Sequence, residues 1–203
     1  MLANAFLSAL MNLIILAGIP FLGYFLYHKI RHKRGFGKIA KRAGLQVGEG
    51  RYIGYSVLAT LLIIAVLLIW PLPIEPFTRE GSAQHDFNGL GLTGQAIIMA
   101  LLYGIIKTGF AEELLFRGLI AGSLGRRLSL LWANVVQAII FLLPHLFILL
   151  VMPEMWGLLI FVFVIALFKG WLRIKSSSII GPWILHGVIN VVVCLSVAAR
   201  TAS

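Results

Sequence analysis

The sequence predicts an all-α protein, a polytopic transmembrane helical bundle of about six spans, and two observations support this. First, 60% of the 203 residues are hydrophobic, whereas a soluble domain is about 45–50% apolar. Second, the apolar residues form long runs, several of which reach the roughly 20 residues that a helix needs to cross a hydrocarbon core. A transmembrane β-barrel would instead alternate apolar and polar residues. We therefore expect one integral-membrane domain over residues 1–203.

The apolar runs define six expected spans in chain order. These are Leu2–Tyr27, Tyr52–Leu72, Thr93–Leu124, Leu128–Met152, Met155–Trp171 and Ser178–Ala199. The first is too long for the apolar region of a signal peptide and basic residues follow it, so we expect an uncleaved anchor. The third is the longest, and we expect it to be tilted, or broken near Gly104 or Gly109. The Pro-rich, polar segment 71–88 is expected to be a loop.

The net charge of +10 is interpreted as a topology signal, not as a sign of nucleic-acid binding. Seven of the 17 Lys and Arg residues lie between Lys29 and Arg42, after the first span. Arg126–Arg127 and Lys169–Lys175 follow the third and fifth spans. All three segments would lie on one side, which the positive-inside rule assigns to the cytoplasm, with both termini outward. We expect anionic lipid headgroups as partners of Lys29–Arg42, and no nucleic acid.

Two adjacent glutamates, Glu112 and Glu113, interrupt the third apolar span. A carboxylate at the centre of a bilayer costs at least about 2.5–3.5 kcal/mol on insertion scales, so the pair requires a reason. Arg117 follows Glu113 by four residues and can pair with it on one helix face. Glu112 points about 100° away and can face the bundle interior. We expect structural pairing for Glu113 and an acid/base role for Glu112.

Two histidines, His145 and His186, also lie in apolar spans. If the third and fourth spans form a hairpin, Glu112 and His145 lie roughly 21–25 Å from its turn and can approach each other. His186 shares a helix face with Asn190, four residues later. Glu112 and His145 could hold and deprotonate one water. His186 and Asn190 could donate hydrogen bonds to a developing oxyanion, so the sequence predicts a hydrolytic site within the bundle.

Three ordered motifs resemble those of the CPBP family, the CAAX proteases and bacteriocin-processing enzymes, which includes the type II CAAX prenyl endopeptidase. The motifs are Glu112-Glu113-x-x-x-Arg117, Phe141-x-x-x-His145 and His186-x-x-x-Asn190. The resemblance covers roughly residues 94–193 and none of the first two spans. It implies a four-span catalytic core over residues 93–199, with two accessory spans and loops in residues 1–92.

The resemblance also implies an intramembrane endopeptidase with a membrane-associated peptide or protein as substrate. Its implied catalytic residues are Glu112, His145, His186 and Asn190, with Glu113, Arg117 and Phe141 in support. We expect an integral protein of the bacterial cytoplasmic membrane. Nothing in the sequence selects the substrate among the kinds that family members process.

Three alternatives remain open from the sequence. Glu112, His145 and His186 have the ligand types of a zinc site, although side-by-side glutamates with an arginine partner fit a metal-free mechanism at least as well, so no cofactor is favoured. A non-proteolytic membrane regulator or bacteriocin-immunity scaffold would not need Glu112. A proton-coupled transporter also uses intramembrane Glu and His, but the chain shows no inverted repeat.

Overall fold

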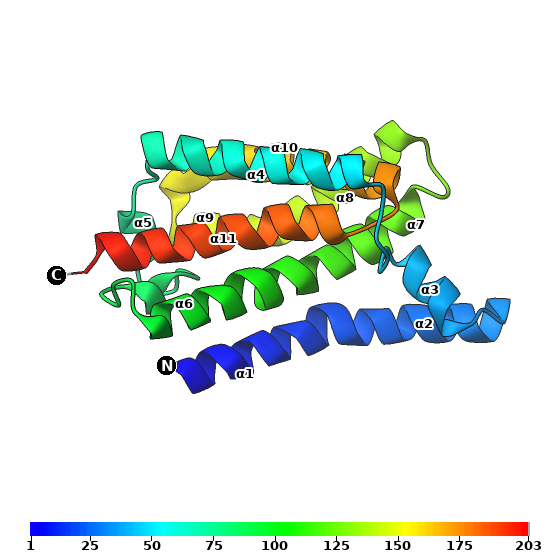
Figure 1. The fold of residues 1–203 in the computed structure, drawn as a ribbon, viewed down its shortest axis with the longest axis horizontal. Helices are drawn as coiled ribbons and strands as arrows, with labels where there is room; N and C mark the ends of the chain where they lie inside the picture. Colours follow the sequence, from blue (N-terminus) through cyan, green and yellow to red (C-terminus); the bar gives the residue numbers. More distant parts are fainter. Residues whose placement is uncertain (203) are drawn as a thin grey trace.

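The computed structural model describes residues 1–202 and consists of long helices that run alongside one another (Figure 1). Within the described residues, six helical segments are long and apolar enough to cross a membrane. They are Leu2–His32, Gly50–Ile69, Gly94–Leu124, Leu130–Val151, Pro153–Ser176 and Ile180–Arg200. Each overlaps one expected span, and no strand occurs in residues 1–202. The predicted all-α, six-span fold is therefore confirmed.

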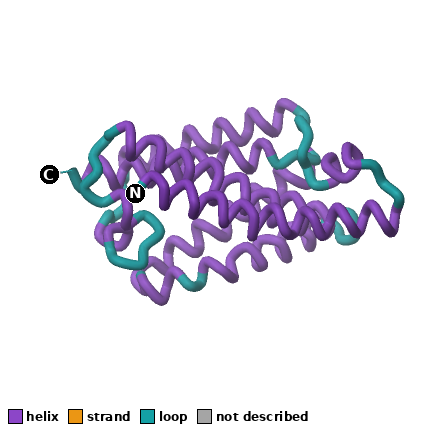
Figure 2. The backbone as a smooth tube through the Cα atoms, turned by 90° about the horizontal axis from the view of Figure 1, so that it is seen from below, coloured by secondary structure: helices purple, strands orange, loops and turns teal. Residues whose placement is uncertain are grey.

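The spans are built from α-helical and π-helical segments and one 3₁₀ turn, η5. In chain order they comprise α1 (Leu2–Asn12), η1 (Leu13–Gly18) and α2 (Ile19–His32); α4 (Gly50–Ile69); α6 (Gly94–Leu101), η3 (Leu102–Phe110), η4 (Glu113–Ala121) and α7 (Gly122–Leu124); α8 (Leu130–His145) and α9 (Ile148–Val151); η5 (Pro153–Met155) and α10 (Trp156–Ser176); and α11 (Ile180–Arg200). The connections hold α3 (Phe36–Arg42), α5 (Glu75–Thr78) and the 3₁₀ turn η2 (His85–Phe87). Loops gather at the two ends of the bundle (Figure 2).

The third and sixth spans form the centre of the bundle. Segment η3 packs against α11, and the first and second spans pack on opposite sides of this pair, α1 against η3 and α4 against α11 (Figure 1). Helices α8 and α10 pack against each other. The two predicted accessory spans therefore flank the core, while the division of the chain at residue 92 remains a proposal.

Small residues allow η3 and α11 to approach closely. A Cβ added at Gly104 would lie 2.7 Å from the Gly187 carbonyl oxygen and 2.8 Å from the Val191 nitrogen. Backbones that approach this closely need glycine at the contact, as is common between membrane helices. The Trp183 indole also donates a hydrogen bond to the Ile105 carbonyl at 2.8 Å.

The third span is not broken at its glycines. It remains one helix from Gly94 to Leu124, with the π-helical segments η3 and η4 on either side of Glu112. The Thr108 hydroxyl donates to the Tyr103 carbonyl at 3.0 Å, which helps to satisfy the backbone there. π-Helical turns are rare in proteins, but those that occur are frequently at functional sites. The unusual winding therefore marks the same stretch as the paired glutamates.

The outer surface is suited to lipid. Large apolar side chains such as Phe6, Leu61 and Leu131 are more than half exposed, at 58%, 58% and 66%. Similar exposure continues along several spans, whereas soluble monomers rarely expose apolar patches beyond a few hundred Å². The protein is thus an integral membrane protein.

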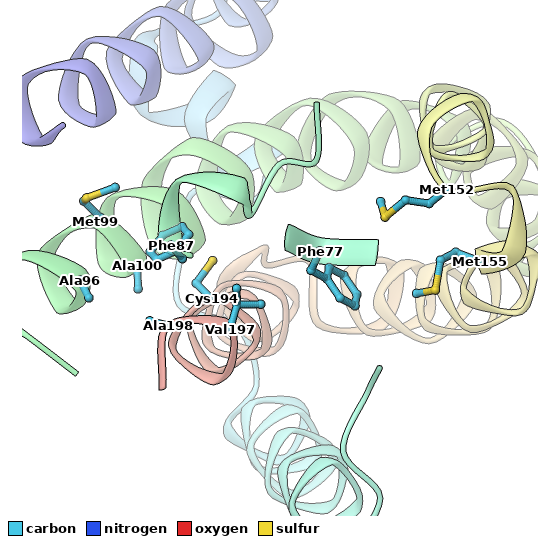
Figure 3. Packing of buried hydrophobic residues seen from close by; sticks show 10 residues of the cluster. All are labelled: Phe77, Phe87, Ala96, Met99, Ala100, Met152, Met155, Cys194, Val197 and Ala198. Atoms are coloured by element: carbon cyan, nitrogen blue, oxygen red, sulfur yellow. The ribbon is translucent and has the colours of Figure 1, made fainter. Parts of the chain in front are cut away.

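The segment 71–88, predicted as a loop, is partly helical and closes the end of the bundle opposite the basic segments. Phe77 of α5 and Phe87 of η2 are buried, with 5% and 2% exposure. They belong to a cluster with Met99, Cys194 and residues of the α9–η5 turn (Figure 3). The prediction of a polar loop did not include the burial of these apolar side chains. That burial explains why part of the segment is helical and packs on the bundle.

Candidate active site

Glu113 is the centre of a buried charge cluster that joins three spans. Its side chain is 0% exposed, and one oxygen, Oε1, is hydrogen-bonded to Lys169 and His186 and ion-paired with Arg117, while Oε2 has no hydrogen-bond partner in residues 1–202. Lys169 Nζ of α10 lies 2.6 Å away, His186 Nδ1 of α11 lies 2.7 Å away, and Arg117 Nη1 lies 3.2 Å away. A carboxylate removed from solvent requires such compensation. The predicted Glu113–Arg117 pair is present, but it is only part of the cluster.

Lys169 was expected in a basic loop after the fifth span, and this expectation is wrong. Helix α10 continues to Ser176, so Lys169 lies inside the span and is 2% exposed. Its ammonium group points to Glu113 because a buried cation needs an opposite charge, and the apolar surroundings offer none. The sequence contains a sign of this position, because Lys169 directly follows the apolar residues Ala166-Leu167-Phe168. The prediction missed it because Lys169 was grouped with Arg173 and Lys175 as one basic segment.

Phe141 explains the aromatic residue of the second motif. Its ring is buried and carries both cations of the cluster on its face, with Arg117 Cζ at 4.0 Å and Lys169 Nζ at 4.8 Å from the centroid. Phe116 packs edge-on against the same ring, with centroids 5.0 Å apart. Cations placed over an aromatic face are stabilised by its quadrupole. Phe141 therefore supports the two cations that pair with Glu113.

Glu112 has a different environment from its neighbour. Its side chain is 16% exposed, and its Oε2 lies 3.9 Å from His186 Nε2. No hydrogen-bond partner for that oxygen occurs in residues 1–202. Because His186 Nδ1 is bound to Glu113, the other ring nitrogen is the one that faces Glu112. The two adjacent glutamates thus divide into one carboxylate that binds Lys169, Arg117 and His186 through Oε1 and one whose buried Oε2 has no hydrogen bond.

Asn190 lies one helical turn beyond His186 on α11. Its Nδ2 donates to the Thr108 hydroxyl at 2.8 Å, across the contact between η3 and α11. A carboxamide nitrogen carries two hydrogens, so one donor remains for another acceptor. Thr108 was not identified from the sequence, where a threonine in an apolar segment has no distinguishing pattern.

His145 contacts the aromatic residue of its own motif. Its Nδ1 bonds to the Phe141 carbonyl at 2.8 Å, and its ring centroid lies 4.5 Å from that of Phe141. No direct hydrogen bond or ion pair joins His145 to Glu112 in residues 1–202, and the expectation that the two hold one water between them stays a prediction. Helix α8 ends at His145 instead of continuing to Met152, which places the ring at a helix end.

A zinc site is one of the alternatives that the sequence leaves open. Within residues 1–202, no group of three or more His, Cys, Asp and Glu residues is arranged to hold a metal ion. Glu112, His145 and His186 therefore do not fit a zinc site in this arrangement. The expectation that no cofactor is used remains a prediction.

The fold and the site together define a class of protein: a six-span integral membrane protein with a carboxylate–histidine cluster inside its bundle. Residues 93–192 match the family model described as Type II CAAX prenyl endopeptidase Rce1-like. The chain therefore carries a domain of the CPBP family, as its three motifs predicted, and this family implies a protease. The chain matches no curated protein and no solved structure.

Proposed function

We propose that the protein is an intramembrane endopeptidase of the CAAX type that hydrolyses a peptide bond in a membrane-associated protein or peptide. One observation carries the proposal. Glu112 presents a buried carboxylate oxygen without a hydrogen bond toward His186 Nε2 at 3.9 Å, while Glu113 beside it is held through Oε1 by Lys169, Arg117 and His186. An unpaired intramembrane carboxylate is costly and by default marks a functional site.

In the proposed reaction, Glu112 accepts a proton from water as the water oxygen bonds to the scissile carbonyl carbon. The carbonyl π electrons move to oxygen and form the oxyanion. When the tetrahedral intermediate collapses, the C–N bond breaks and the proton held by Glu112 passes to the leaving nitrogen. The Asn190 hydrogen not used by Thr108 supports a role as oxyanion donor.

The two histidines have different support. Glu113 holds the His186 ring through Nδ1, as a buried carboxylate orients the histidine of serine hydrolases. This leaves Nε2 for the water or the oxyanion and extends the role of Glu113 from structural pairing to positioning. His145 is bound through Nδ1 to Phe141, and its role in water activation rests on the resemblance and on the similar depth of His145 and Glu112 expected from the sequence.

The decisive experiment compares Glu→Gln variants on a library of quenched-fluorescence membrane peptides in liposomes. Glu112→Gln is expected to abolish turnover with an unchanged melting temperature, because it removes the base and keeps the shape. Glu154→Gln is the matched control, since Glu154 is 44% exposed in an ion pair with Arg79 and such pairs contribute little. A wild-type rate for Glu112→Gln would show that the assigned base is wrong.

A chelator arm in the same assay tests the metal. We expect activity to survive chelation and zinc to remain well below one equivalent. Loss of both zinc and activity on chelation would overturn the metal-free mechanism. A folded wild-type protein that cleaves no peptide would favour the regulator or immunity scaffold.

A further inference from the structure

A cavity of about 350 Å³ lies at the basic end of the bundle, away from the candidate active site. It is bounded by α3, by the turn after α7 and by the end of α10. Four cations line it, and no acidic residue does: Lys41, Arg42, Arg126 and Arg173. We call it the arginine cavity. Its charge is therefore uniformly positive.

Arg173 is the most buried of the four. It is 4% exposed and passes between two glycines. A Cβ at Gly44 would lie 2.7 Å from its Nε, and a Cβ at Gly122 would lie 2.6 Å from its Nη2. Nη2 donates to the Arg42 carbonyl at 2.8 Å, whereas Nε has no partner in residues 1–202. Two glycines thus make room for a buried guanidinium whose donors are not all used.

Arg42 and Arg126 add to this excess of donors. The Arg42 Nε is buried and also lacks a partner in residues 1–202. Arg126 donates only to neutral groups, the Arg42 carbonyl, the Tyr24 hydroxyl and the Ser123 hydroxyl. None of the three guanidinium groups forms an ion pair in the described residues. This is the reverse of the Glu113 cluster, where carboxylates offset the cations.

Arg173 and Arg42 each have a buried donor nitrogen without a partner, and Arg126 lines the same cavity without an ion pair, so the cavity favours an anion from outside the chain. We propose that the arginine cavity binds the phosphate group of an anionic lipid. Guanidinium groups match phosphate with paired hydrogen bonds, and basic pockets between transmembrane helices bind lipid headgroups. The position favours lipid over free phosphate, since the lining residues Gly125 and Ser177 directly follow the ends of the third and fifth spans.

The test measures thermal unfolding of the detergent-solubilised protein with three probes: dihexanoyl phosphatidylglycerol, inorganic phosphate, and chloride at matched ionic strength. Saturating lipid at about 100 times its Kd is expected to raise the Tm by about 5–10 °C. Arg126→Gln is compared with Arg127→Gln, which removes the same charge from an exposed neighbour that does not line the cavity. The double variant Arg42→Gln/Arg126→Gln strengthens the comparison. These readouts do not depend on proteolysis.

The lipid-dependent rise should persist in Arg127→Gln and fall sharply in Arg126→Gln and in the double variant. A rise with inorganic phosphate that shows the same arginine dependence would support the site and assign it to free phosphate. If Arg126→Gln and Arg127→Gln responded equally to lipid, the rise in Tm would come from general surface charge and not from the cavity, which would overturn the proposal. No shift of the wild-type protein with either phosphate probe would also overturn it.

Discussion

Adjacent identical residues have opposite surroundings at the centre of this protein. Glu113 binds charged groups of three spans through Oε1, whereas the Oε2 of Glu112 lies beside His186 without a hydrogen bond. The difference follows from helix geometry, because consecutive side chains leave a helix in different directions. One carboxylate can therefore stabilise the bundle while the other remains available for proton transfer.

Lys169 should contribute to the stability of the protein by pairing with the buried Glu113 carboxylate. Lys169→Met removes the shortest contact of Glu113, and breaking a buried pair from one side typically costs about 3–5 kcal/mol. Lys175→Met is the control, because Lys175 is exposed on the same helix. Unfolding of Lys169→Met, Glu113→Gln and the double variant should show a non-additive cycle. Strictly additive losses would mean that the two charges are not coupled.

Asn190 should act on the chemical step. Asn190→Ala is expected to lower kcat by about 10²–10³ with little change in KM, as for loss of one oxyanion donor. Asn190→Asp should be at least as damaging, since a carboxylate would repel the oxyanion. Thr108→Val, which removes the anchor of the carboxamide, should cause a smaller loss in kcat. An Asn190→Ala effect confined to KM in steady-state kinetics would require the role to be withdrawn.

At the scale of elements, the contact between η3 and α11 positions the site. It brings Thr108 to Asn190, and η4 continues the same helix to bring Glu113 to His186. The glycines Gly104 and Gly187 set the distance between the two helices. π-Helical winding around Glu112 changes which side chains face α11. This change was not evident when the third span was interpreted as a regular α-helix.

Gly104→Ala should separate these two helices. The added Cβ would meet backbone atoms of Gly187 and Val191 at 2.7 and 2.8 Å, and forcing atoms into a packed interior typically costs about 1–3 kcal/mol. Both Tm and kcat should fall. Gly54→Ala on α4 is the matched control, because nothing lies within 4 Å of its added Cβ. Equal behaviour of the two variants would argue that the close contact does not position the site.

For the whole molecule, the distribution of charge predicts orientation. Lys169 and Arg173 are buried in α10, so they no longer count as loop charges. The segment Lys29–Arg42 and the pair Arg126–Arg127 remain at the same end of the bundle (Figure 1). The positive-inside prediction therefore rests on these two segments and keeps its direction.

Cysteine labelling of intact cells tests this orientation. Lys38→Cys should react only after the membrane is permeabilised, whereas Ala3→Cys should react from outside. Both positions are exposed, and the native Cys194 is 0% exposed, so it should give little background. Labelling of position 38 from outside would reverse the predicted topology.

The sequence by itself determined the six spans, the paired glutamates and the three motifs. A hydrocarbon core demands long apolar helices, so each ionisable residue within them stands out, and spacing of four residues shows which ones share a face. Only the tertiary structure decided that Lys169 completes the Glu113 cluster, that Thr108 holds Asn190, that His145 bonds to the Phe141 carbonyl, and that three arginines surround one cavity. These relations depend on how helices rotate and pack against one another, and a periodic pattern along one chain carries no information about the partner that each face meets.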